Sequence, residues 1–249
     1  MNVVKVGGNE LDNTDFVTQL AGAVAALGEP AIVVHGGGKA IGDLQERLGL
    51  TPRKVDGLRV TDEPSLGIAQ MVLSGNVNKR LVQALLQRGV QAVGLSGVDG
   101  GLLRCQKKIY MGHDLGLVGH IVEVNALILD ALGQYGFTAV VSPISLGLDG
   151  AIYNVNADEA AGAIASNIGA KKVWFISNVA AVLDQDRKAI GVLTQDQASG
   201  LIENGVIRDG MLPKVRTALE VVASGVPEVI IANIDGLMHG AGTRFIRSV

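Results

Sequence analysis

The chain has 249 residues, a formal net charge of −3 and no run of like charges, which does not fit a nucleic-acid-binding protein. No apolar stretch approaches the roughly 20 residues of a membrane span, and no signal sequence opens the chain, so we expect a cytoplasmic protein without membrane contact. Cys105 is the only cysteine, which excludes an internal disulfide and fits a reducing compartment.

The first half of the chain alternates between strand and helix patterns. A buried-type strand at 3–6 precedes a helix that Asn13 or Thr14 can cap and that Gly28 and Pro30 end. In order, the apolar spacing then predicts a strand at 31–34, a helix at 39–48, a helical region from Pro64 to 72, a second helical segment at 77–86 and a strand at 91–95.

The second half opens with an expected antiparallel ribbon, whose strands are 102–108 and 119–124 around a turn at 112–114. The elements expected after it are a helix at 126–135, strands at 138–142 and 172–176, helices at 158–168, 194–204 and 212–224, and a last interior strand at 228–232. With 34 glycines and 3% aromatic residues, this alternation predicts an α/β protein. Its mostly parallel sheet is covered by helices on both faces, with ligands at the carboxyl ends of the strands.

Two glycine turns follow predicted strands. Gly36-Gly37-Gly38 lies between an apolar strand and a helix, and Gly7-Gly8 follows the first strand with Lys5 nearby. Glycine lets backbone N–H groups approach a ligand closely, and a helix N-terminus favours an anion. Neither turn fits the G-x-G-x-x-G or Walker A pattern. The sequence therefore predicts anion binding at these two strand ends.

A second group of candidates is charged. Lys214 enters a helix directly after Pro213, and a lysine in a first turn opposes the helix dipole unless an anion lies there. Asp158 has two interpretations, as a helix N-cap or as an acid that holds two lysines in place. The four histidines have no metal-site spacing, so they are interpreted as structural, with His35 packing beneath its glycine turn.

These groups fit phosphoryl transfer. Such a reaction needs positive charge and dipoles around the transferring group and little covalent help from the protein. An acceptor carboxylate, with a pKa of about 4, would need no general base, and the chain offers no obvious one.

Several motifs in unbroken order resemble the amino-acid kinase family, and within it the acetylglutamate kinases. They are Lys5-Val6-Gly7-Gly8, Val34-His35-Gly36-Gly37-Gly38, Asp56-Gly57-Leu58-Arg59-Val60-Thr61, Asn154-Val155-Asn156-Ala157-Asp158 and Asp209-Gly210-Met211-Leu212-Pro213-Lys214. The resemblance implies a three-layer αβα sandwich that forms a single domain over 1–249. Its N-lobe, about 1–154, would bind the amino-acid substrate and dimerise, and its C-lobe, about 155–249, would bind the nucleotide.

The same resemblance implies that the γ-phosphate of MgATP is transferred to the side-chain carboxylate of N-acetyl-L-glutamate, as in arginine synthesis. Lys5 and Lys214 would stabilise the transition state and Asp158 would organise them. The substrate would be held by Gly37, Gly38, Arg59 and Asn154. The nucleotide would be bound by Gly7, Gly8, Asn178, Val179, Ala180, Ala181, Val182, Leu183, Val206, Ile207, Arg208 and Gly210. The protein itself would supply no metal site, because the nucleotide phosphates would hold Mg²⁺. Residues 114–119 match a hairpin that closes over the amino-acid pocket.

Two features depart from the family pattern. Asn178 stands where acetylglutamate kinases usually carry aspartate, which keeps a kinase acting on carrier-linked aminoadipate or glutamate as the alternative. The stretch 231–242 is shorter than usual, so a C-terminal helix is expected to be missing. A non-catalytic regulatory module and a nicotinamide dehydrogenase are less well supported by the motifs.

The expected assembly is a homodimer that arginine does not inhibit. Arginine-inhibited relatives carry an additional N-terminal helix that interlaces dimers into a hexamer. In this sequence Met1-Asn2 leads directly into the first strand.

Overall fold

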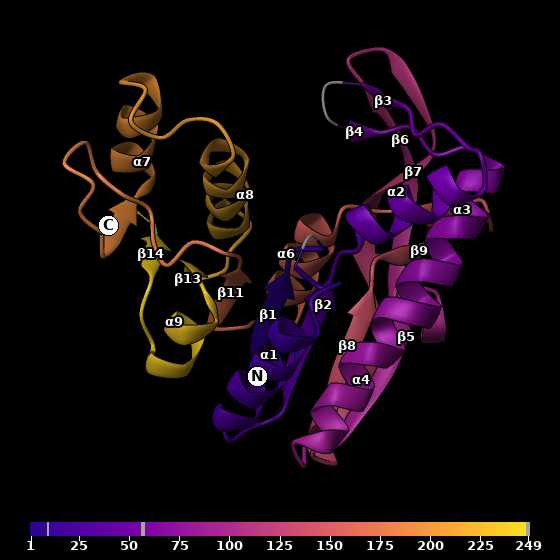
Figure 1. Ribbon diagram of the computed structural model, residues 1–249, viewed down its shortest axis with the longest axis horizontal. Coiled ribbons are helices and arrows are strands. Elements are labelled where there is room, and N and C mark those ends of the chain that lie inside the picture. Colours follow the sequence, from indigo (N-terminus) through magenta and orange to yellow (C-terminus); the bar gives the residue numbers. More distant parts are fainter. Residues whose placement is uncertain (9, 56–57, 248–249) are drawn as a thin grey trace.

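The computed structural model describes residues 1–8, 10–55 and 58–247, with the side chains of Lys54, Leu58 and Arg59 outside this description. Its centre is an eight-stranded sheet with the order β12-β14-β13-β11-β1-β2-β8-β5 (Figure 1). The strands of this sheet are β1 (Asn2–Val6), β2 (Ala31–His35), β5 (Ala92–Ser96), β8 (Thr138–Ser142), β11 (Lys172–Ile176), β12 (Val192–Thr194), β13 (Glu228–Ala232) and β14 (Thr243–Ile246).

The sheet is parallel from β13 to β5, as the alternation of strands and helices predicts. β14 runs antiparallel to β13, and the edge strand β12 is parallel to β14. Lys5 on the central strand β1 is opposite Val34 of β2 on one side and Phe175 of β11 on the other. The carboxyl ends of β1, β2 and β11 therefore lie next to one another, where ligands bind in folds of this class.

Helices cover both faces of the sheet, which confirms the predicted α/β sandwich. The helices are α1 (Thr14–Ala26), α2 (Gly38–Arg47), α3 (Glu63–Gln70), α4 (Asn78–Gln87), α5 (Leu127–Gln134), α6 (Ala157–Asn167), α7 (Gln195–Glu203), α8 (Met211–Ala223) and α9 (Ile234–His239), with a short 3₁₀ turn at Asp99–Gly101. Val3 and Val4 point to opposite faces because side chains alternate along a strand. Val4 belongs to the core beneath α1, α4 and α9, and Val3 to the core beneath α6 and α8.

A smaller β layer lies beside the N-terminal half of the sheet. Its strands β6 (Leu103–Tyr110), β7 (His113–Val124), β9 (Ile144–Gly147) and β10 (Ile152–Asn154) close into a small barrel. β6 and β7 are the predicted antiparallel ribbon, and they extend further than expected toward their turn. The short strands β3 (Lys54–Val55) and β4 (Leu58–Arg59) pair near this hairpin (Figure 1).

The helical region after Pro64 contains an unpredicted feature. Asp62 caps α3, and α3 continues through a π-helical segment, Met71–Val77, into α4. A π-helical segment inserts extra backbone into a helix and rotates the turns on its C-terminal side, and such segments are common beside functional sites. This one brings Leu73 and Asn78 beneath the glycine turn that follows β2.

One expectation for the C-terminal region is wrong. The strand at 228–232 is not the last interior strand, because β14 follows it and lies between β13 and β12. The stretch 231–242 contains a short helix, α9, which Asn233 caps and Gly240 ends, and the absence of a further family helix stays a prediction. The six residues of α9 are too few for a clear periodic signal in the sequence.

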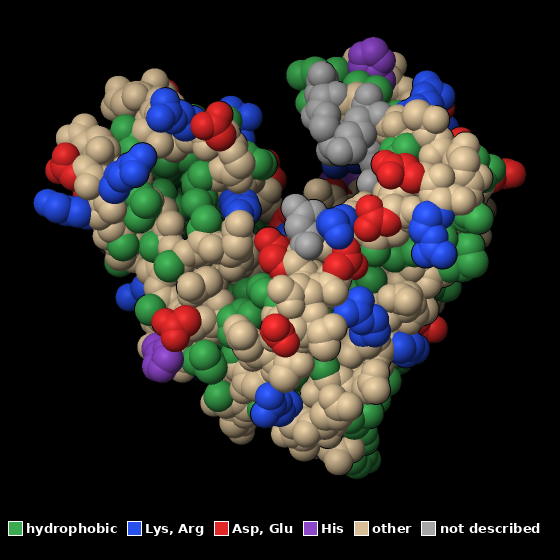
Figure 2. All heavy atoms as spheres, in the orientation of Figure 1, with side chains coloured by type: hydrophobic (Ala, Val, Ile, Leu, Met, Phe, Trp, Pro, Cys, Tyr) green, Lys and Arg blue, Asp and Glu red, His purple; other side chains and the backbone are tan. Residues whose placement is uncertain are grey.

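The surface has a deep hollow between the part that carries α7 and α8 and the part that carries the β6–β7 hairpin (Figure 2). The strand ends of β1, β2 and β11 open toward this hollow (Figure 1). Among the described residues, no helix is both long and apolar enough to span a bilayer.

Candidate active site

The two glycine turns pack directly against each other. β1 and β2 are parallel neighbours, and the Gly36 amide donates to the Val6 carbonyl at 3.0 Å. A Cβ on Gly8 would overlap the backbone nitrogen of Gly37 and lie 2.8 Å from that of Gly38. The backbone nitrogens of the second turn therefore face Gly8, and only glycine fits there. The sequence predicted a close approach of these turns to a ligand, whereas the close approach in the structure is between the two turns themselves.

The helix that follows these turns begins without a side-chain cap. Gly37 is the N-cap of α2, and a glycine offers no side chain to satisfy the first-turn amides. A helix N-terminus of this kind carries partial positive charge and suits an anion. Anion binding at the end of β2 stays a prediction.

Lys5 and Asp158 form an ion pair across the end of the central strand. Lys5 Nζ lies 2.6 Å from Asp158 Oδ1, and the lysine side chain is only 14% exposed. Asn156 is the N-cap of α6, because its Oδ1 accepts from the Asp158 amide at 2.7 Å. The N-cap interpretation of Asp158 is therefore wrong, and its carboxylate points to Lys5 from the first turn of the helix.

Two cavities meet at this ion pair. The smaller, of about 280 Å³, lies between the glycine turn after β2 and the start of α6. The larger, of about 750 Å³, extends from the Gly7-Gly8 turn to the start of α8. Four described residues line both, namely Lys5, Gly8, Asn156 and Asp158. Two ligands in these cavities would thus meet beside one lysine and one carboxylate.

Most of the predicted site residues line one of the two cavities, and the predicted substrate and nucleotide sets line different ones. The smaller is lined by Gly37, Gly38 and Asn154 of the predicted substrate set. The larger is lined by Gly7, Gly8, Asn178, Val179, Arg208 and Gly210 of the predicted nucleotide set, together with Lys214. The Arg59 side chain lies outside the described part of the structure.

Other members of the predicted nucleotide set do not line the larger cavity. They are Ala180, Ala181, Val182, Leu183, Val206 and Ile207. Val182 and Ile207 are core residues, 1% and 2% exposed. A motif match covers a continuous segment, whereas only some residues of a loop can face a cavity.

Lys214 lines the larger cavity. It lies in the first turn of α8, whose N-cap Gly210 has no capping side chain. Among the described residues, Asp158 forms an ion pair with Lys5 and none with Lys214. The structure therefore places both lysines on one cavity but joins only Lys5 to the acid.

Several residues that line the cavities were not predicted individually as site residues. Asn156 lines both. Val118 of β7 lines the smaller one and belongs to residues 114–119, which the family resemblance predicted to close over the amino-acid pocket. Glu10 and Asp209 line the larger one, Asp209 with a left-handed backbone, φ 50°. The alternating polar residues of Asn154-Val155-Asn156 were the one available signal, because alternate strand residues share a face.

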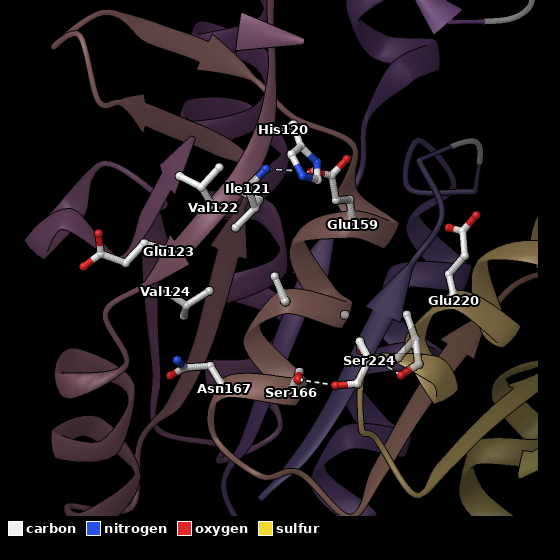
Figure 3. Close-up of a pocket in the computed structure, with 13 residues that line it drawn as sticks. His120, Ile121, Val122, Glu123, Val124, Glu159, Ser166, Asn167, Glu220 and Ser224 are labelled. Carbon is white, nitrogen blue, oxygen red and sulfur yellow. Dashed lines mark hydrogen bonds and ion pairs between the residues drawn. The ribbon is translucent and has the colours of Figure 1, made fainter. Parts of the chain in front are cut away.

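The β6–β7 hairpin is tied to the helix that carries Asp158. Glu159 Oε1 accepts from the Ile121 amide at 2.7 Å and from His120 Nδ1 at 2.8 Å (Figure 3). Lys108 Nζ donates to Glu159 Oε2 at 3.2 Å. Both strands of the hairpin are thereby fixed to the first turn of α6. Through Val118, the hairpin forms one wall of the smaller cavity.

A separate groove of about 600 Å³ lies between β7, α6 and α8 (Figure 3). It shares none of its described lining residues with the two cavities at the ion pair. In this groove, Glu159 already accepts a hydrogen bond from the hairpin, and the Ser166 hydroxyl donates to the Ser224 carbonyl. We therefore take the two joined cavities as the candidate active site.

The amino acid kinase family is matched by residues 1–233. The chain belongs to this family. An acetylglutamate kinase of Roseiflexus sp. (strain RS-1) is 48% identical over 97% of this chain and 92% of its own length. An acetylglutamate kinase of Methanopyrus kandleri is 44% identical over 98% of this chain and 99% of its own length. The identification agrees with the family resemblance of the motifs.

Solved structures share the fold of this amino acid kinase. The structure of smu.665 from Streptococcus mutans UA159 matches with a TM-score of 0.81 and 28% identity, and covers 98% of both chains. An N-acetylglutamate synthase from Neisseria gonorrhoeae, complexed with coenzyme A and N-acetyl-glutamate, matches with a TM-score of 0.85. It is 23% identical, and the match covers 100% of this chain and 59% of the synthase, so it supports the fold alone.

Proposed function

We infer that this amino acid kinase is an acetylglutamate kinase, which transfers the γ-phosphate of ATP to the side-chain carboxylate of N-acetyl-L-glutamate. Acetylglutamate kinases 44–49% identical to it over nearly the full chain support this assignment. The observation that carries it is the meeting of two cavities at the Lys5–Asp158 pair. One cavity suits a small amino-acid derivative, and the larger one suits a nucleotide.

In the proposed reaction, a carboxylate oxygen of the substrate forms a bond to the γ-phosphorus while the bond from that phosphorus to the β,γ-bridging oxygen breaks. The products are an acyl phosphate and ADP, and no proton has to be removed from the carboxylate. Lys5 and the backbone amides of Gly37 and Gly38 stabilise charge on the transferring group. Asp158 orients Lys5 by its short ion pair.

We assign the larger cavity to ATP and the smaller to acetylglutamate. Lys214, at the N-terminal end of α8, faces the phosphates from the C-terminal half of the chain and stabilises the β–γ bridge as it breaks. Asn154, which pairs with Val118 and also lines the smaller cavity, binds the acyl-amino group. Arg59 binds the substrate's α-carboxylate through its planar guanidinium.

We also propose that Mg²⁺ accompanies ATP and is bound mainly by the nucleotide phosphates, as is usual for this ion. No group of three or more histidine, cysteine, aspartate or glutamate side chains that could hold a metal occurs among the described residues. The ion supplies charge neutralisation on the phosphates, while the lysines and glycine amides supply it from the protein.

A homodimer completes the proposal. β5 is an edge strand of the large sheet, paired among the described strands with β8 alone, and Leu86 at the end of the neighbouring α4 is 50% exposed. An edge strand beside exposed apolar surface suits a self-complementary contact between two copies. A cytoplasmic location stays a prediction from the sequence.

A coupled assay of ADP release tests the assignment. Acetylglutamate should be the best substrate among acetylglutamate, glutamate, aspartate and aminoadipate. Low activity on all four free acids, together with turnover of carrier-linked aminoadipate or glutamate, would replace it with the alternative to which Asn178 points. Light scattering of the same sample, with and without arginine, measures the assembly.

A further inference from the structure

A buried hydrogen-bond chain lies beneath the glycine turn at the end of β2. His35 and Asn78 are both 0% exposed, and Asn78 Nδ2 lies 3.2 Å from His35 Nε2. His35 Nδ1 lies 3.0 Å from the carbonyl oxygen of Gly36. Buried polar groups need partners, and here the partners connect the start of α4 to the turn.

The direction of each hydrogen bond follows from groups that can only donate or only accept. Lys79 Nζ, which only donates, lies 3.0 Å from Asn78 Oδ1 and thereby fixes the orientation of the amide. The Asn78 Nδ2 group then faces three acceptors, the Val140 carbonyl at 2.9 Å, the Leu95 carbonyl at 3.3 Å and His35 Nε2 at 3.2 Å. The Gly36 carbonyl can only accept, so the neutral ring carries its proton on Nδ1, which donates to that carbonyl, and presents an unprotonated Nε2 to the Asn78 amide.

The ring is neutral because burial lowers the pKa of His35 to about 4. A neutral ring has one donor and one acceptor, and both are used in this chain of bonds. The network is closely packed, since a Cβ on Gly94 would overlap Asn78 Oδ1.

The bond to Gly36 sets the direction of the next amide. The carbonyl of Gly36 and the N–H of Gly37 belong to one trans peptide, in which they point in opposite directions. When His35 holds the carbonyl toward the core, the Gly37 N–H points away from the core. The Gly37 nitrogen does face Gly8, on the cavity side of the turn.

We propose that His35 and Asn78 are positioning residues that hold the Gly36–Gly37 peptide so that the Gly37 amide faces the transferring phosphoryl group. The role of that amide rests on the proposed function, whereas the hydrogen-bond chain does not. The π-helical segment Met71–Val77 supports this role, because it ends where Asn78 enters the network.

Two substitutions of His35 separate positioning from packing. In His35→Asn the side-chain amide nitrogen takes the place of Nδ1 and keeps the bond to Gly36. In His35→Gln the terminal amide takes the place of Nε2, which keeps the contact to Asn78 and loses the bond to Gly36. Both variants lose ring volume, so both are expected to lower the melting temperature by a similar amount.

Steady-state kinetics on the intact enzyme should show a kcat for His35→Gln about tenfold or more below that of His35→Asn, because loss of an oxyanion donor acts on the transition state. The KM for ATP should stay within twofold. Equal kcat values for the two variants, or kcat losses that only follow the melting temperatures, would overturn the proposal.

The nitrogen spectrum of the imidazole tests the hydrogen-bond chain without any substrate. In ¹⁵N-labelled protein between about pH 6 and 8, His35 should show a protonated Nδ1 and an unprotonated Nε2. The signals of these two nitrogens are assigned to His35 because they are absent from the spectrum of His35→Asn. A protonated Nε2 would contradict the inference whatever the substrate is. Inactivity of the wild-type enzyme on acetylglutamate, with this spectrum intact, would instead count against the proposed function.

Discussion

Lys5 Nζ lies 2.6 Å from Asp158 Oδ1, and this ion pair joins the central strand to the start of α6 at the point where the two cavities meet. A pair so placed aims the ammonium group at ligands in both cavities. Its contribution to the reaction can be measured separately from its contribution to folding.

Asp158→Asn should lower kcat about 10- to 100-fold with little change in either KM, because the amide keeps the shape but no longer holds Lys5 by charge. Lys5→Met and the double variant complete a cycle. The double variant should be little worse than Lys5→Met alone, since the two residues act as one unit. Strictly multiplicative losses would mean that Asp158 acts independently of Lys5.

Lys214→Ala should reduce kcat on the order of 100-fold while the KM values change little, because its charge acts mainly on the transition state. Arg216→Ala, two residues further along α8 and not among the residues that line the cavity, is the matched control. A near-normal kcat for Lys214→Ala would remove this lysine from the mechanism.

Gly8→Ala should abolish most activity, because the new Cβ would overlap the backbone nitrogen of Gly37, which cannot move aside as a flexible side chain could. The control is Gly22→Ala in α1, where a Cβ meets nothing within 4 Å. That change should leave activity intact and raise the free energy of unfolding by roughly 0.5–1 kcal/mol. Full activity in Gly8→Ala would show that the two turns can separate.

Glu159→Gln should raise the KM for acetylglutamate about two- to fivefold and leave the KM for ATP unchanged, since partly exposed ion pairs are worth up to about 1 kcal/mol. The reason is weaker attachment of the hairpin that walls the smaller cavity. Glu123→Gln, at an exposed position on the hairpin strand β7, is the control. A larger effect on ATP than on acetylglutamate would reverse the assignment of the cavities.

Acidic pH should destabilise the fold through His35. Its pKa is lowered from 6.5 to about 4, so below pH 6.5 the unfolded chain binds a proton that the folded chain does not. From His35 alone, the free energy of unfolding should fall by about 1.4 kcal/mol per pH unit between these values, and by about 3 kcal/mol in all. Above pH 6.5 the residue has no effect. Urea unfolding from pH 7.5 to pH 5 should be less steeply pH-dependent in His35→Asn, and equal slopes would contradict this origin.

The sequence predicts the sheet well because its parallel strands are buried on both faces and appear as short apolar runs. β2, β8 and β13 are buried at every position. β12 and β14 were missed because they are only three and four residues long and half of their side chains face outward. Their pairing depends on contacts far along the chain, such as Arg244 with Glu228 at 2.8 Å.

Parts of the candidate site were predictable because their residue types have few structural uses at those positions. Examples are the glycine turns at strand ends and the lysine at the start of a helix. Asn156 was missed because an asparagine before a helix is a common cap, and it does cap α6 while also lining both cavities. Residues 178–183 form an irregular loop, in which only some side chains face the larger cavity. The sequence of such a loop has no periodic pattern from which the direction of each side chain could be predicted.

The hollow of Figure 2 is bridged at its base by unbroken sheet, since β1 pairs with β11 over four residues, Val3 to Val6. The two halves of the enzyme are therefore joined by hydrogen-bonded strands at this β1–β11 seam. Lys5 lies within the seam, whereas Lys214 lies at the start of α8. A change in the width of the hollow that twisted or bent the seam would therefore also change the position of Lys5 relative to Lys214.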